Sequence, residues 1–124
     1  MNIPISHQTI MPYLVITGAE KFFDFAKKVF SAEEIFKSVR EDGKTIMHAE
    51  IKIGGCTIMF AETTESSKIQ PAGLFIYVED ADVTYKKALE EGASTLMGIS
   101  DQDYGRTCGV KDPCGNTWWI TAVL

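Results

Sequence analysis

The stretch DYGRTCGVKDPCGNTWWI, residues 103–120, indicates how the C-terminal part of the chain folds. Residues 107–111 and 117–123 read as strands, and the segment DPCGN between them is dense in residues that favour turns. The pattern predicts a β-hairpin. Because successive side chains of a strand point to opposite faces, Trp118 and Ile120 share one face of the last strand, and Trp119 lies on the other.

The hairpin is preceded by a strand and a helix, and this plan occurs twice in the sequence. The segments PYLVITGAEKFFDFAKKVFSAEE (residues 12–34) and GLFIYVEDADVTYKKALEEGAST (residues 73–95) resemble each other. Each begins with a short run rich in β-branched and aromatic residues, which is typical of a strand. Each continues with apolar residues at helical spacing. The sequence therefore indicates a duplicated module.

A second hairpin completes the first module. Residues 46–53 alternate and meet residues 56–61 across Gly54-Gly55, and a two-residue glycine link between alternating runs favours a tight turn. Short strands near 35–40 and 95–99 complete the plan β-α-β-β-β, twice. We predict an α+β chain that forms a single domain over residues 1–124, with modules at about 10–62 and 72–122.

Composition limits the classes of function. The 124 residues carry a formal net charge of −5, which argues against a partner that is a nucleic acid or an anionic membrane surface. The three cysteines form no CxxC pair, and the first residues have no basic and apolar leader pattern. No apolar stretch is long enough for a membrane span. We therefore expect a cytoplasmic protein with no nucleic-acid or membrane partner.

These motifs resemble the glyoxalase/bleomycin resistance protein/dioxygenase superfamily, also called vicinal oxygen chelate, from about Met11 to Thr121. The most specific motif is DPCGNTWWI, and the segment MHAEIKIGG is similar to the PhnB-like branch. The resemblance implies two modules forming a partly open barrel around a cavity, with the helices outside. It also implies a homodimer and a small-molecule ligand.

The metalloenzymes of this family draw His, Gln or Glu ligands from four strands. Registering the chain on the motif DFAKKV places the corresponding positions at Met11, Met59, Gly73 and Trp119. These residues lack the nitrogen and oxygen donors that hard divalent metals need. We therefore expect no metal and no other cofactor.

Strand alternation predicts which side chains face the cavity. In the first hairpin Ala49, Ile51 and Ile53 share an apolar face, whereas His48 and Glu50 lie on the opposite, more polar one. The expected ligand-binding residues combine aromatic and apolar walls with polar anchors: Tyr13, His48, Glu50, Met59, Phe75, Tyr77, Arg106 and Trp119.

Each of these assignments has an alternative. The aromatic residues could simply fill the core, and Arg106 could be a surface residue stacked on Tyr104 instead of an anion clamp. His48 beside Glu50 could be structural, or it could act as a general base. Two functions follow: a metal-free small-molecule-binding protein, or a lyase, isomerase or dioxygenase that uses His48 and Glu50 as base or atypical metal site. The sequence leaves open whether the protein is an enzyme.

Overall fold

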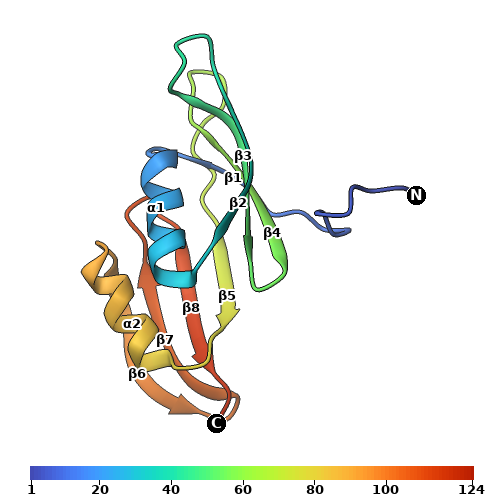
Figure 1. Ribbon diagram of the computed structural model, residues 1–124. Coiled ribbons are helices and arrows are strands. Elements are labelled where there is room, and N and C mark those ends of the chain that lie inside the picture. The colour runs from blue at the N-terminus through green and yellow to red at the C-terminus, as the bar shows by residue number, and fades with distance from the viewer.

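The computed structural model describes residues 1–124, which form two four-stranded sheets and two helices (Figure 1). The elements of the first half follow in chain order: β1 (Tyr13–Ile16), α1 (Ala19–Phe30), β2 (Glu33–Val39), β3 (Ile46–Ile53) and β4 (Cys56–Glu62). The second half has the elements β5 (Gly73–Tyr77), α2 (Ala81–Glu90), β6 (Ser94–Gln102), β7 (Gly105–Lys111) and β8 (Thr117–Ala122).

The two halves have the same topology, which confirms the duplicated β-α-β-β-β plan. The strand orders are β1-β4-β3-β2 and β5-β8-β7-β6. The first strand of each half runs parallel to the last, and the other neighbours are antiparallel. Neither sheet closes on itself, in agreement with the predicted open α+β architecture.

The hairpin of β3 and β4 has the predicted register. Ile53 pairs with Cys56 and Ile51 pairs with Ile58 across the turn. Both turn glycines have positive φ, 53° at Gly54 and 85° at Gly55, a conformation that costs other residues free energy. This turn fixes which side chains of both strands face the helices.

Helix α1 begins without a capping side chain of its own, because its N-cap residue is Gly18. The Glu62 carboxylate at the end of β4 supplies the cap, accepting hydrogen bonds from the backbone N–H groups of Gly18 and Ala19, both at 3.0 Å. A carboxylate at a helix N-terminus also interacts favourably with the helix dipole. The contact fixes α1 to the end of its sheet.

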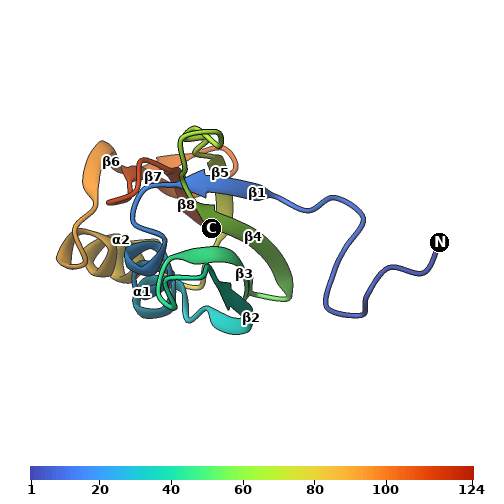
Figure 2. The ribbon, with the colours of Figure 1, turned by 90° about the horizontal axis from the view of Figure 1, so that it is seen from above.

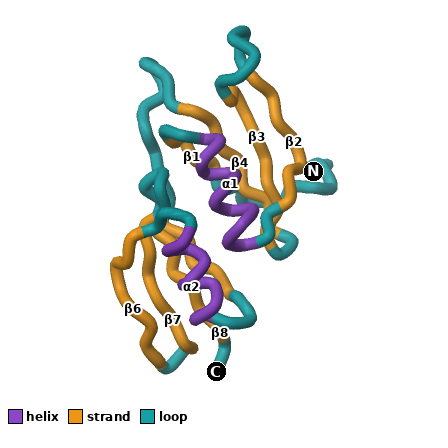
Figure 3. The backbone as a smooth tube through the Cα atoms, turned by 60° about the vertical axis from the view of Figure 1, so that its left-hand side comes forward, coloured by secondary structure: helices purple, strands orange, loops and turns teal.

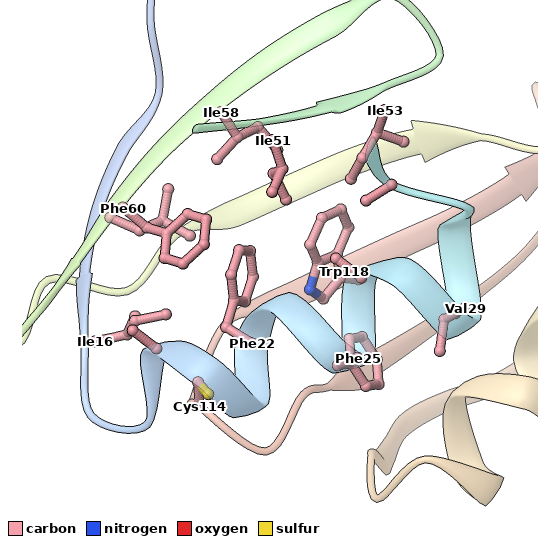
Figure 4. Close-up of a cluster of buried hydrophobic side chains, with 14 of the residues drawn as sticks. Ile16, Phe22, Phe25, Val29, Ile51, Ile53, Ile58, Phe60, Cys114 and Trp118 are labelled. Carbon is pink, nitrogen blue, oxygen red and sulfur yellow. The ribbon is translucent and has the colours of Figure 1, made fainter. Parts of the chain in front are cut away.

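Both helices cover the same side of the two sheets (Figure 3), and viewed from above they lie next to each other (Figure 2). The core beneath α1 joins the halves. Phe22 packs edge-on against Phe60 of β4, with 4.9 Å between the ring centroids (Figure 4). The ring centroid of Phe30 lies 4.5 Å from that of Trp118 of β8. Burying a side chain of this size contributes about 1.5–3 kcal/mol. Neither helix is both long and apolar enough to cross a lipid bilayer.

The turn between β7 and β8 is organised by Asp112, which is almost fully buried. Its carboxylate accepts hydrogen bonds from the backbone N–H groups of Cys114 and Asn116, from the Asn116 amide at 2.9 Å and from the Trp118 indole at 2.8 Å. The DPCGN segment is therefore a turn, as predicted. Because Trp118 is fixed inward, the next residue of the strand, Trp119, faces outward.

Candidate ligand-binding site

The second sheet presents an aromatic face on the side away from the helices. Cross-strand pairing places Phe75, Trp119, Gly109 and Met97 in one row across β5, β8, β7 and β6. Opposite residues in a row project to the same side of a sheet. The indole of Trp119 lies over Gly109, which has no side chain to fill that space.

The aromatic side chains of this face are solvent-accessible. The exposed fractions are 49% for Phe75, 63% for Tyr77 and 37% for Trp119. Phe75 lies 5.3 Å from Tyr77 and 6.0 Å from Tyr104, measured between ring centroids. The prediction that Phe75, Tyr77 and Trp119 lie opposite the core is therefore confirmed, and these residues remain available for contact.

The first sheet presents a more polar face. Tyr13, Met59, Glu50 and Phe36 form the corresponding row across β1, β4, β3 and β2. The ring of His48 lies between Tyr13, at 5.6 Å, and Phe36, at 5.9 Å. The structure thus brings together the four residues that were expected to line the cavity from this half, Tyr13, His48, Glu50 and Met59.

Glu50 bonds two histidines. Only 8% of the Glu50 residue is exposed. Its carboxylate oxygens are 2.8 Å from Nε2 of His48 and 2.7 Å from Nε2 of His7. Burial alone would raise the pKa of Glu50, but the hydrogen bonds from His48 and His7 outweigh it and lower the pKa below 4.5. Glu50 is therefore a buried carboxylate held in its ionised form.

His7 reaches this site because the segment before β1 is anchored to β4. The Gln8 side chain donates to the Thr57 carbonyl at 2.8 Å and accepts from the Thr57 N–H at 3.2 Å. The Thr57 hydroxyl donates to the Ser6 carbonyl. Sequence reasoning missed His7, because an isolated histidine in a segment without periodicity gives no signal of its position.

A groove of about 550 Å³ lies where the two halves approach each other. It is lined by the segment before β1, the tip of the β3–β4 hairpin and β5. Of the expected ligand-binding residues, Phe75 and Tyr77 line it. The contacts of His48 and Glu50, and those of the aromatic face, otherwise stay within their own halves of the chain.

The placement of Arg106 as a polar anchor of the cavity is wrong. Arg106 alternates with Cys108 and Val110, both buried beneath the helices, and it therefore projects to the helix side of β7. Its guanidinium forms two hydrogen bonds to Asp82 of α2, at 2.8 and 3.1 Å, and one to Asp101 at 3.0 Å. Nε, Nη1 and Nη2 of Arg106 thus each donate to one of these aspartates, which also balance the charge of the guanidinium.

The three cysteines are free thiols. Burial raises the pKa of both Cys108 and Cys114 to about 11, so these thiols stay protonated at neutral pH. They are structural, whereas Cys56 is exposed at the hairpin turn.

Comparison with known proteins assigns the chain to a family. Residues 6–120 match the model of the glyoxalase/bleomycin resistance protein/dioxygenase superfamily. The chain belongs to this superfamily. An uncharacterized protein from Mycobacterium bovis is 32% identical, with 88% of this chain and 79% of the relative covered.

Solved structures of other proteins share the fold. A PhnB protein from Bacillus cereus superposes with a TM-score of 0.73 at 18% identity, covering 94% of this chain and all of that one. TnmS3, an antibiotic-binding protein from a Streptomyces species, gives a TM-score of 0.72 at 17% identity, covering 95% of this chain and 100% of that one. The PhnB-like resemblance is consistent with these matches.

The metal that some superfamily enzymes use does not fit the residues of this chain. Met11 is a thioether whose sulfur accepts the Gln8 N–H at 3.4 Å, and Gly73 has no side chain. Met59 and Trp119 lie on the open faces of their sheets, but a thioether and an indole are poor ligands for hard divalent ions. His7, Glu50 and His48 are hydrogen-bonded through the Glu50 carboxylate, but neither they nor any other three His, Cys, Asp or Glu side chains are grouped to hold a metal ion.

Proposed function

We propose that this superfamily member is a metal-free small-molecule-binding protein. The observation that carries the proposal is the group of solvent-accessible aromatic side chains on one face of β5 and β8: Phe75, Tyr77 and Trp119. Small-molecule sites are mostly apolar with a few placed polar groups, and aromatic faces stack on planar ligands. The antibiotic-binding neighbour TnmS3 shows that the fold supports such a role in another protein.

The polar part of the site comes from the first half. Glu50 supplies carboxylate oxygens that accept hydrogen bonds, and His48 supplies imidazole nitrogens that can donate or accept them. Tyr13 and Met59 lie next to these two residues on the same face. The proposed ligand-binding residues are therefore Tyr13, His48, Glu50, Met59, Phe75, Tyr77 and Trp119. Within one chain the hydrogen bonds and ring contacts of each group stay in its own half, and none joins the two groups.

We propose that the protein works as a homodimer, which would bring the polar group of one copy to the aromatic group of the other. In each chain the faces away from the helices are open, and the polar face of one copy can be set opposite the aromatic face of the other.

The shared core beneath α1 supports treating each chain as one domain. The free cysteines support a reducing, cytoplasmic location.

A mixed dimer tests the shared cavity. Glu50→Gln is made in one chain and Trp119→Ala in the other, the two are co-expressed with different tags, and the mixed dimer is purified. If each cavity uses both chains, one of its two sites carries both changes and the other carries none. Binding of a planar aromatic probe then has half the wild-type stoichiometry and unchanged affinity. Loss of every wild-type site, or a monomer in solution, would overturn the shared cavity.

A second candidate function is catalysis of the lyase or isomerase type by His48. The hydrogen bond between Nε2 of His48 and Glu50 leaves Nδ1 free to take a proton. A His48→Gln variant distinguishes the two functions. Binding without turnover predicts at most a change in affinity, whereas general-base catalysis predicts loss of turnover by about 10²-fold or more.

A further inference from the structure

Arg40 has a donor that nothing in the chain satisfies. Its Nε–H is the one buried side-chain polar atom of the protein without a hydrogen-bond partner. An unsatisfied buried donor costs about 1–3 kcal/mol, more when the group is charged. The rest of the guanidinium makes one long bond, from Nη2 to the Glu62 carbonyl at 3.5 Å, and no ion pair.

Two acidic groups near Arg40, Asp42 and Glu62, are used elsewhere. The Asp42 carboxylate accepts the backbone N–H groups of Lys44 and Thr45 within the turn, at 2.9 and 2.8 Å. The Glu62 carboxylate caps α1. By contrast, the second arginine of the chain, Arg106, is paired with two aspartates. The charge of Arg40 therefore lacks a partner within the protein.

The position of Arg40 points to the ligand site. Its backbone is fixed at the start of the turn after β2, with its N–H bonded to the Thr45 carbonyl at 2.8 Å. Ser38, two residues earlier, pairs with His48 on the polar face. Arg40 follows the last residue of β2, Val39, and its backbone bond to Thr45 continues the pairing with the next strand. The alternation of β2, extended by one residue, therefore puts Arg40 on the side of Ser38 and His48. The residue is partly exposed, so a solute can reach it.

We propose that Arg40 binds an anionic oxygen group of the ligand, a carboxylate or a phosphonate, at the end of the polar face. A guanidinium presents its donors as a planar fork that matches such groups bidentately. This inference rests on the proposed binding function and adds a ligand class: a planar aromatic compound that carries an anionic oxygen group. Glu50, which is itself ionised, disfavours an anion placed directly beside it and leaves Arg40 as the anchor.

The two arginines make a direct test possible, because a ¹H–¹⁵N spectrum contains one Nε–H signal for each. The full-length protein is titrated with benzoate, with phenylphosphonate and with the neutral benzamide, and the Arg40 signal is assigned with Arg40→Lys. We expect both anions to shift the Arg40 signal saturably. Benzamide should not shift it, and the Arg106 signal should stay in place.

Variants complete the test. Arg40→Gln should weaken benzoate binding by about tenfold or more, the loss expected for a charge-assisted hydrogen bond. Arg40→Lys, which keeps the charge but not the fork, should retain weaker binding, and Arg106→Gln should bind as the wild type does. An unsaturable response to both anions, or equal shifts with benzamide, would overturn the assignment. Planar neutral compounds that bind in a Trp119-dependent way despite that result would leave the proposed function intact.

Discussion

The indole of Trp119 lies so close to Gly109 on the neighbouring strand that a methyl group at Gly109 would stand 2.7 Å from Cε3 of the ring. This distance is shorter than any ordinary contact between carbon atoms. Gly109 thus leaves room for the indole beside it, and 37% of the Trp119 residue remains exposed. The position of the Trp119 ring therefore depends on the absence of a side chain at Gly109 of the neighbouring strand.

Gly109→Ala should displace this ring. We expect a loss of about 1–3 kcal/mol in the free energy of unfolding, as for other overpacked sites, and easier quenching of the Trp119 fluorescence by iodide. Urea denaturation and quenching measure the two effects. Gly98→Ala is the matched control, because a Cβ there meets nothing within 4 Å. Equal behaviour of the two variants would contradict the close contact.

The Glu50 carboxylate should make stability depend on pH in the acidic range. Its pKa is lowered in the folded protein, so its contribution is fully present above pH 4.5 and is lost as the pH falls through the lower, folded value. Glu50→Gln should be less stable than the wild type by about 1–2 kcal/mol near neutrality, and this gap should shrink in acid. Thermal melts over a pH series measure it. A gap that does not change with pH, or one equal to that of the exposed Glu65→Gln, would contradict the ionised state of Glu50.

Asp112→Asn should destabilise the turn that positions Trp119. The amide replaces one carboxylate oxygen by a donor, so at least one of the buried N–H groups of Cys114, Asn116 or Trp118 loses its acceptor. We expect a loss of about 3 kcal/mol in unfolding free energy, with a weaker near-ultraviolet dichroism signal from tryptophan. Asp103→Asn, in an exposed position, is the control. Wild-type stability of Asp112→Asn would show that the network is not required.

Divalent metals should not stabilise the protein. A metal that binds the native state alone must raise the melting temperature, and the Met11, Met59, Gly73 and Trp119 positions give it no hard donor. Thermal melts with Ni²⁺, Zn²⁺, Mn²⁺ and Fe²⁺ are therefore expected to match melts with a chelator. A clear rise that His48→Ala abolishes would establish an atypical metal site at His48 and Glu50.

Short-range rules predicted the two faces of each hairpin. The Gly54-Gly55 turn sets the register of β3 and β4. Alternation then places His48 and Glu50 on the face of β3 that points away from the face of Ile51. The same rule, applied from Cys108, puts Arg106 on the helix side of its strand, where it pairs with Asp82. The predicted strand starts at residue 107, whereas β7 starts at Gly105, so the alternation was not extended to Arg106.

Other parts of the site depend on contacts that the sequence does not display. His7 is brought to Glu50 by the bonds between Gln8 and the backbone of Thr57, across 49 residues of chain. Arg40 lacks a partner because the neighbouring Glu62 and Asp42 carboxylates bond backbone N–H groups, which the sequence does not display. Pattern analysis locates faces of elements, whereas the partners of isolated polar side chains require the tertiary arrangement.

The most direct test of the central proposal is ligand-observed NMR on protein treated with a chelator. A library of planar aromatic compounds is screened by saturation transfer against the wild type, Trp119→Ala and the control Gly98→Ala. We predict that at least one compound receives saturation from the wild type and from the control, and loses it with Trp119→Ala. Binding that appears only after a divalent metal is added, or that persists unchanged in Trp119→Ala, would contradict a metal-free aromatic site.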